Sequence, residues 1–363
     1  MNTKNIIIAA LTGGLMSTAA LGAGIDLTIT GSTAFSSIAY DRVPALFDAG
    51  MQKYTNSANA NQFTYVGTVG TKIPSLGATQ VRIRVAFSGS AAGMLAVRDS
   101  TPIATLTADN TTANIVPDLS FSDVYPESAT PSIDGTVFDQ SIVGVVPFVF
   151  VKNNGLAGIV NITRDQAVVL MDNSGMIDVG VPGMPATWLG GTSPDPVYLV
   201  GRNSGSGSRI TVEKDINYIG GPSLWATNPP STTWVRSTGL SAGSDVRKTV
   251  AAKADAIGYM GPSDAAQITA TATSLTYNGV AYSAANVASG KYALSGYVHL
   301  VNRAGALTAE QQAINDQLVA DMTDPVYQAG APYTPSFVPL SEMKVQRGAD
   351  GGILIPTDWT PVP

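Results

Sequence analysis

The sequence has no cysteine and only one histidine, His299, among its 363 residues. Without cysteine the chain can form no disulfide, no thiolate metal site and no lipid-bearing cysteine after an export signal. One histidine and no cysteine cannot build a usual zinc site either. The sequence therefore predicts no metal site and no cofactor.

Charged residues are also scarce, at 13% of the chain, and the 26 acidic residues outnumber the 20 lysines and arginines, for a formal net charge of −6. An acidic chain argues against nucleic-acid binding, which depends on cationic patches. With 44% hydrophobic residues, the chain is long enough to fold as one large or two medium domains. No later segment has the roughly 18 consecutive apolar residues of a membrane-spanning helix, so we expect no membrane insertion.

The first 24 residues, "MNTKNIIIAALTGGLMSTAALGAG", have the composition of a secretory signal. Lys4 precedes an apolar run that begins at Ile6, and small residues follow at positions 22–24, as in a cleavable signal peptide. A first core helix is the alternative. Cleavage would remove Lys4 and no acid, which changes the net charge from −6 to −7. We expect a protein exported to the periplasm without a lipid anchor.

The remaining chain repeats a strand, a small-residue turn and a helix. Residues 25–30 alternate as a strand and lead through a Gly-Ser-Thr turn into a helix, with Ser36 or Ser37 as its N-cap. Residues 81–87 lead through "SGSAAG" into another helix, and a third strand ends at Ser122 and Asp123.

The second half of the chain continues this alternation. Residues 141–153 form one apolar run, typical of a continuous strand buried on both faces. Thr163 and Gln166 form a capping pattern, and the final helix is expected from Thr308. Strands that alternate with helices predict α/β layers, with ligand loops at the carboxyl ends of the strands.

The stretch "GRNSGSGSR", residues 201–209, follows one of these strands and collects hydrogen-bond donors. Helix N-termini offer free N–H groups, glycine lets the backbone approach a ligand closely, and Arg202 adds a charge-assisted fork. A single Gly/Ser turn is more often an ordinary surface loop. Several such turns at strand-to-helix junctions favour an oxyanion site.

Five segments, in order, resemble the periplasmic phosphate-binding subunits of ABC transporters over nearly the whole mature chain. They are "ITGSTAF", "FSGSAAG", "SFSDVY", "RNSGSGS" and "AIGYMG". The resemblance implies a set of phosphate ligands: Ser32, Thr33, Ala34, Phe35, Ser90, Asp123, Arg202, Ser206, Gly207 and Ser208.

The resemblance also implies the architecture and the partners. It implies an α/β, two-lobed periplasmic-binding-protein fold, type II-like, in which each lobe is a mixed sheet flanked by helices and the ligand cleft lies between the lobes. Residues 25–144 and 293–363 would form lobe one, and residues 145–292 lobe two. The chain would act as a monomer that captures inorganic phosphate and delivers it to an ABC permease.

Asp123 would set the choice of anion. A carboxylate can accept a hydrogen bond from a protonated phosphate oxygen, whereas sulfate has no proton to give at neutral pH and would meet an unrelieved like charge.

The sequence also departs from the family pattern. Ser204 stands where an aspartate often holds the arginine, Ala91 stands where a second serine is common, and Ser208 replaces a threonine. We therefore expect Arg202 to be less firmly oriented. Residues 48–80 and 173–198 match the family poorly.

Three alternatives stay open at this point. Another tetrahedral oxyanion, such as sulfate or molybdate, could be the ligand. "GLSAG" at 239–243 matches the nucleophile elbow of a secreted hydrolase with Ser241 at its centre, but it lacks a buried strand before it, and His299 lies in the apolar strand "YVHLV". The chain could also be a surface protein that keeps the fold without the ligand. We favour a binding protein over an enzyme.

Overall fold

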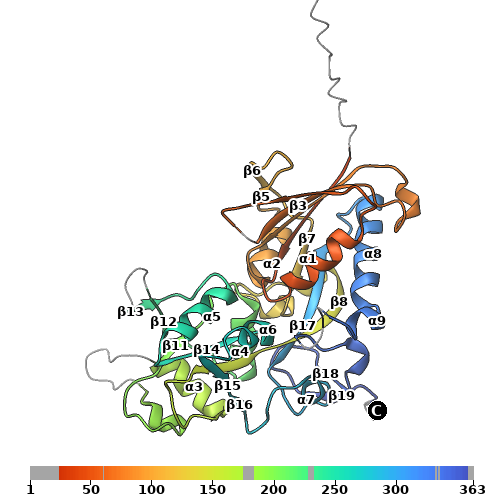
Figure 1. The fold of residues 1–363 in the computed structure, drawn as a ribbon. Helices are drawn as coiled ribbons and strands as arrows, with labels where there is room; N and C mark the ends of the chain where they lie inside the picture. Colours follow the sequence, from red (N-terminus) through yellow and green to blue (C-terminus); the bar gives the residue numbers. More distant parts are fainter. Residues whose placement is uncertain are drawn as a thin grey trace, which may run out of the picture.

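The computed structural model describes residues 24–59, 61–174, 184–227, 233–331, 333 and 336–358. The chain folds into two lobes, each built on its own sheet (Figure 1). The predicted signal peptide lies outside the described residues, apart from Gly24. Among the described helices, none has the length and apolar character needed to cross a bilayer.

The first lobe contains a seven-stranded mixed sheet. Its strands, in spatial order, are β2 (Gln52–Thr55), β3 (Gln62–Gly67), β4 (Val81–Phe87), β1 (Ile25–Gly31), β7 (Leu119–Ser122), β17 (Ser295–Arg303) and β8 (Phe138–Pro147). The three neighbours β4, β1 and β7 run parallel. Their carboxyl ends therefore meet at one edge of the sheet, and the loops that follow them are neighbours.

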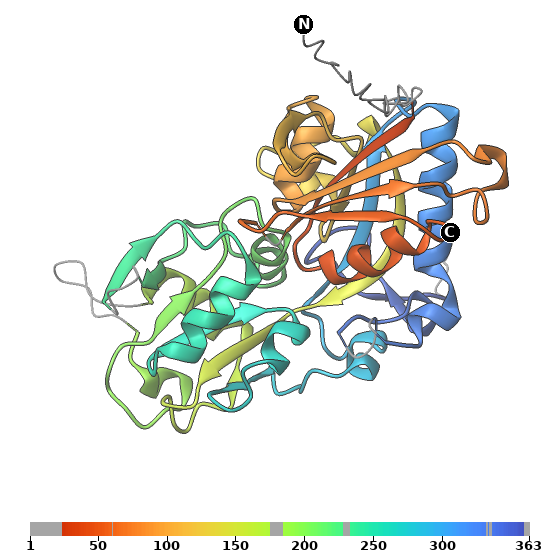
Figure 2. The same ribbon diagram turned by 45° about the horizontal axis from the view of Figure 1, so that its top comes forward.

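Helices cover both faces of this sheet (Figure 2). Leu27 and Ile29 of β1 belong to the large core together with α1 (Ser36–Ala45) and α8 (Ala309–Thr323). Val301 belongs to a separate cluster with Met94 of α2 (Ser90–Arg98), whereas its neighbour Leu300 belongs to the large core. Because side chains alternate along a strand, α2 lies on the opposite face from α1 and α8.

The second lobe contains a four-stranded sheet with the order β11 (Tyr198–Val200), β14 (Ala256–Met260), β9 (Val149–Asn153) and β15 (Ala272–Ser274). β11 and β14 are parallel, so the loops after them also share one edge. The lobe carries α3 (Arg164–Asn173), α4 (Gly207–Asp215), α5 (Gly243–Ala252) and α6 (Pro262–Ala266).

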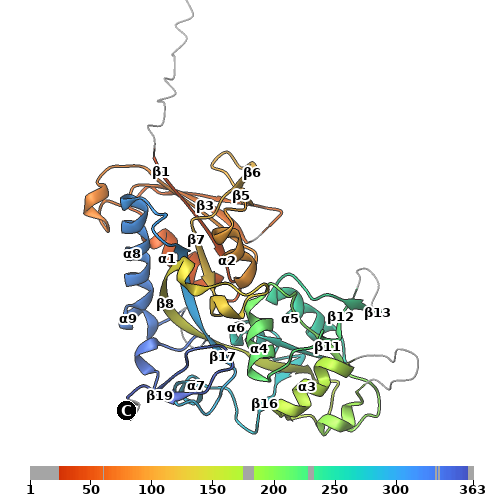
Figure 3. The ribbon, with the colours of Figure 1, turned by 180° about the vertical axis from the view of Figure 1, so that it is seen from behind.

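Shorter elements complete the chain. Four two-stranded pairs are β5 (Ile103–Leu106) with β6 (Thr112–Ile115), β10 (Asn161–Ile162) with β16 (Thr276–Tyr277), β12 (Leu224–Thr227) with β13 (Trp234–Ser237), and β18 (Val345–Gln346) with β19 (Ile355–Pro356). The remaining helices are α7 (Ala284–Ala288) and α9 (Pro325–Gln328). From behind, α9 continues the line of α8 along the outer side of the first lobe, and β19 lies beyond it (Figure 3).

The predicted helix cap was confirmed at α3 but not at α1. Thr163 and Gln166 form a reciprocal capping box, as do Thr308 and Gln311 at the start of α8. The prediction that Ser36 or Ser37 caps α1 is wrong, because the helix begins at Ser36 with Phe35 as its N-cap and no side-chain cap. The Ser36 hydroxyl instead donates to the Thr33 carbonyl.

The prediction of one continuous strand over 141–153 is also wrong. The run divides at Phe148, with β8 in the first sheet and β9 in the second. The chain returns at Leu294, whose carbonyl accepts a hydrogen bond from the Phe148 N–H at 3.0 Å. The two connections between the sheets therefore lie side by side. The lobe boundaries predicted at Gly144 and Tyr292 stay a prediction.

Candidate anion-binding site

Three loops of the first lobe meet at the edge where β1, β4 and β7 end. Ser32 follows β1, Ser90 follows β4 as the first residue of α2, and Asp123 follows β7. The Ser90 hydroxyl accepts a hydrogen bond from the Asp123 N–H at 3.1 Å, which ties two of the loops together. All three residues are at most 2% exposed.

The loop after β1 is closed by its own serine. The Ser32 hydroxyl oxygen accepts from the N–H groups of Ala34 (3.1 Å) and Phe35 (3.3 Å). The Phe35 ring is fully buried against Phe121 and Phe337. Phe35 thus anchors this loop to the core, and its ring does not face solvent.

The second lobe contributes a buried guanidinium. Arg202 is 2% exposed; its Nε donates to the Leu240 carbonyl (3.1 Å) and its Nη2 to the Ser241 carbonyl (2.9 Å). Within the described residues, Nη1 donates no hydrogen bond to the protein. Burial lowers the pKa of Arg202, and the nearby Tyr259, Asp123 and Asp264 act in the opposite direction.

The exposed Ser204 does not hold the guanidinium, and the carbonyls of the segment 239–241 do. That Arg202 is held less firmly than an aspartate would hold it stays a prediction. Gly239 has φ of +104°, and a Cβ there would lie 2.1 Å from the Arg202 carbonyl oxygen. Only glycine allows this close approach.

The N-terminus of α4 lies against the first lobe. Ser206 precedes the helix, and its hydroxyl lies 2.9 Å from that of Ser208. A Cβ on Gly207 would lie 2.4 Å from the Ser90 Oγ and 2.9 Å from the Asp123 Cβ. The Ala91 N–H donates to the Gly205 carbonyl at 3.1 Å. The two lobes therefore touch at this point.

Asp123 is a buried acceptor in this contact. Its Oδ1 is buried, and no donor among the described residues hydrogen-bonds to it. Burial raises the pKa of Asp123 from 3.8 to about 6, while Ser32, Arg202 and Ser90 act in the opposite direction. A buried oxygen without a donor is costly unless a ligand supplies one. Asp123 is thus suited to a ligand that carries a proton.

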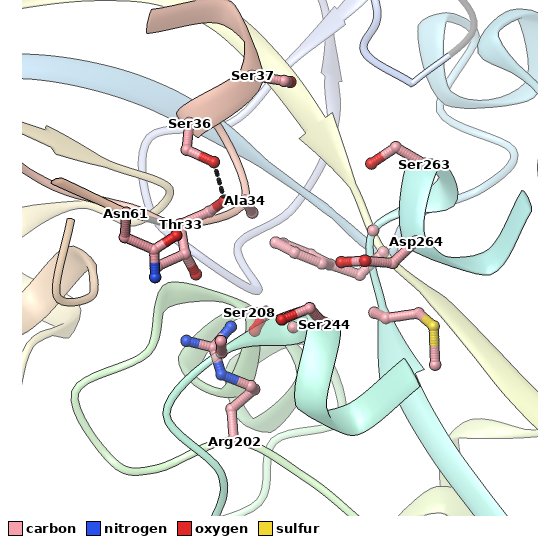
Figure 4. Close-up of a pocket in the computed structure, with 15 residues that line it drawn as sticks. Thr33, Ala34, Ser36, Ser37, Asn61, Arg202, Ser208, Ser244, Ser263 and Asp264 are labelled. Atoms are coloured by element: carbon pink, nitrogen blue, oxygen red, sulfur yellow. Dashed lines mark hydrogen bonds between the residues drawn. The ribbon is translucent and has the colours of Figure 1, made fainter. Parts of the chain in front are cut away.

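A cavity of about 170 Å³ opens beside Arg202 (Figure 4). Four of the ten predicted residues line it: Thr33, Ala34, Arg202 and Ser208. The other six lie outside its lining. Of these, Ser90, Asp123 and Gly207 form the contact between the lobes, and Ser32, Phe35 and Ser206 support the loops on either side.

The sequence analysis missed a group of polar residues that line the same cavity. They come from the loop before β3, the first turn of α5 and the start of α6: Asn61, Ser244, Ser263 and Asp264. The segment "AIGYMG" did point to β14, and the residues directly after that strand include Ser263 and Asp264. Their position in the loop after a parallel strand is the sequence signal that could have identified Ser263 and Asp264.

The structure does not assemble the residues of a hydrolase around Ser241. The Ser241 side chain is exposed, and the Ser241 backbone carbonyl accepts a hydrogen bond from the Arg202 Nη2. Among the described strands, the segment before Ser241, β13, pairs with β12 alone and lies outside the main sheet. His299 is buried in β17 of the other lobe with its ring 4.6 Å from that of Tyr125, and burial lowers its pKa to about 4.

Within the described part of the chain, no group of three or more His, Cys, Asp or Glu side chains is arranged to hold a metal ion. The polar groups of the site among the described residues are instead the Arg202 guanidinium, hydroxyls, backbone amides, the Asn61 side-chain amide and two carboxylates. This set can hold an anion and can accept protons from it.

No protein-family model and no curated protein sequence matches the chain. Several solved structures do. A Clostridium perfringens protein, described as a phosphate ABC transporter substrate-binding protein and solved with bound phosphate, is 15% identical, with a TM-score of 0.56 over 87% of this chain and 99% of that chain.

Two further structures are similar over most of the chain. The phosphate-binding protein from Stenotrophomonas maltophilia is 13% identical (TM-score 0.51; 87% of this chain, 91% of that chain). An ABC-type phosphate transport receptor from Vibrio cholerae is 15% identical (TM-score 0.50; 81% of this chain, 93% of that chain). The two-lobed α/β fold expected from the sequence is confirmed, and the chain shares it with these binding proteins.

Proposed function

We propose that this protein is an exported solute-binding protein that captures phosphate between its two lobes. The observation that carries the proposal is the placement of two buried groups on opposite sides of the contact between the lobes: the Arg202 guanidinium and the Asp123 carboxyl, whose Oδ1 has no donor among the described residues. The similar fold of binding proteins solved with phosphate supports it.

Phosphate suits both groups at once. Arg202 and the Ser206 and Ser208 hydroxyls would donate to its unprotonated oxygens, and Asp123 would accept the proton of its P–OH group. Sulfate would face Asp123 without a proton to share. Micromolar affinity requires about 8 kcal/mol, which a few charge-assisted hydrogen bonds of about 1.5–3 kcal/mol each can supply.

The wider assignment follows from the same proposal. Lobe one (25–144 and 293–363) and lobe two (145–292) would close by a hinge at the two adjacent connections, and the closed form would dock on an ABC permease. The protein would work as a periplasmic monomer and make or break no bond.

Calorimetric titration of the mature protein, stripped of endogenous anion, tests the proposal at neutral pH. We expect one-to-one phosphate binding and little response to sulfate. Asp123→Asn should weaken phosphate binding by about 10-fold and reduce the preference over sulfate, because an amide can donate to either anion. Unchanged affinities for both anions in this variant would refute the role of Asp123.

A further inference from the structure

The cavity beside Arg202 extends away from Asp123. Its lining includes Arg202 and Ser208, but neither Asp123 nor Ser90, and it continues to the first turn of α5 and the start of α6. An engineered protein cavity of about 150 Å³ holds benzene, which has six heavy atoms, so a cavity of about 170 Å³ exceeds the needs of a five-atom phosphate.

The lining beyond Arg202 is polar and varied. Thr33 and Asn61 lie on one side, and Ser263 and Asp264 lie on the other, with Arg202, Ser208 and Ser244 between them (Figure 4). Such a wall offers hydroxyl, amide and carboxylate partners, which bare phosphate would leave unused.

Asp264 is held in place for such a role. Its Oδ1 accepts from the Arg247 Nε at 3.1 Å, one turn along α5 from Gly243. Within the described residues nothing donates to its Oδ2, which would lie 2.7 Å from a Cβ built on Gly243. A carboxylate oxygen that faces the cavity only accepts hydrogen bonds, so it selects a hydroxyl or ammonium group on the ligand.

The Arg202 guanidinium gives one part of the cavity a positive charge, which suits a phosphoryl group. Arg202 lines the cavity, is 2% exposed and has Nη1 without a protein acceptor among the described residues. We propose that the cavity takes a phosphate monoester, with its phosphoryl group at Arg202 and Ser208 and a short, hydrogen-bond-donating organic arm directed toward Ser244 and Asp264. This proposal rests on the proposed phosphate-binding function.

Titrations with inorganic phosphate, glycerol 3-phosphate and phosphoethanolamine test it. Measurements at pH 6 keep part of each ester monoprotonated, so that it carries a proton for Asp123, because the second pKa of a phosphate monoester is about 6. We expect at least one ester to bind about 10-fold more tightly than inorganic phosphate, as two added polar contacts would allow.

A cavity-filling variant distinguishes the contribution of the organic arm to binding from that of the phosphoryl group. Ser244→Leu should weaken ester binding by about 10-fold more than it weakens phosphate binding, since the arm needs that space in addition to the phosphoryl group. Ser263→Ala, which keeps the space open, is the milder control.

The outcomes separate the two proposals. Tight phosphate binding with weaker binding of both esters would overturn the monoester proposal and leave the phosphate function intact, as would ester binding that is unchanged in Ser244→Leu. Binding of none of the three probes would overturn both.

Discussion

The two lobes contribute opposite halves of the candidate anion-binding site in different ways. The first lobe supplies the acid Asp123 and serine hydroxyls from loops after three adjacent parallel strands, and these loops are tied to one another. The second lobe supplies the cation Arg202, which is held by carbonyls from a segment 38 and 39 residues away in sequence. The first-lobe half is therefore organised by local strand–loop–helix geometry. The second-lobe half depends on hydrogen bonds between segments that are distant in sequence.

Removing the cation should have the largest effect. Arg202→Ala should weaken phosphate binding by about 100-fold, because charge-assisted hydrogen bonds contribute about 1.5–3 kcal/mol each. Calorimetric titration measures the loss. Arg164→Ala, at an exposed arginine in α3 of the same lobe, should stay within about twofold of the unmodified protein. If Arg202→Ala bound phosphate as tightly as the unmodified protein, the cation of the second lobe would have no role in binding.

The acid of the first lobe should affect stability with a defined pH dependence. Because burial raises the pKa of Asp123 to about 6, the folded protein holds this proton more tightly than the unfolded chain does. The contribution of Asp123 to stability is therefore complete below pH 3.8 and is lost as the pH rises through about 6. Ligand-free Asp123→Asn should be more stable than the unmodified protein by about 3 kcal/mol at pH 7.5, at 1.36 kcal/mol per pKa unit, and no more stable near pH 3.

Urea unfolding at several pH values checks this difference. The lowered pKa of His299 destabilises the fold as the pH falls from 6.5 toward 4, so the difference between variant and unmodified protein isolates Asp123. Asp350, also buried with its pKa raised to about 6, is the matched control. Asp350→Asn should follow the same stability trend, and because the Asp350 charge helps to raise the pKa of Asp123, this variant should also lower that pKa. Parallel pH curves for Asp123→Asn and the unmodified protein would contradict the prediction.

The contact between the lobes offers a steric test. Gly207→Ala places a methyl group 2.4 Å from the Ser90 hydroxyl and should hold the lobes apart. We expect about 10-fold weaker phosphate binding, in line with the 1–3 kcal/mol cost of overpacking. In Gly205→Ala the nearest atom, the Ala92 Cβ, lies 3.4 Å away, so binding should be retained. Solution scattering with phosphate would show whether closure is lost only in Gly207→Ala.

The smallest effect is expected at Ser241. Only its backbone carbonyl holds Arg202, so Ser241→Ala should bind phosphate within about twofold of the unmodified protein. An ester-turnover assay run in parallel tests the hydrolase alternative. Ester hydrolysis that disappears in this variant would favour that alternative over a purely binding role.

The sequence predicted the first-lobe loops better than the second-lobe carbonyls that hold Arg202. Ser32, Ser90 and Asp123 each follow a strand that is visible as an apolar pattern, and parallel neighbours bring such loops together. The Leu240 and Ser241 carbonyls carry no side-chain signature, so nothing in "GLSAG" indicated that they hold Arg202.

The sequence by itself determined the alternation of strands and helices and the capping boxes at Thr163 and Thr308, because these depend on neighbours within a few positions. Only the tertiary structure decided that the run 141–153 divides at Phe148 between two sheets, that carbonyls hold Arg202, and that Ser244 and Asp264 share its cavity. These features depend on contacts between distant segments, which strand pairing and lobe packing create and which local pattern does not encode.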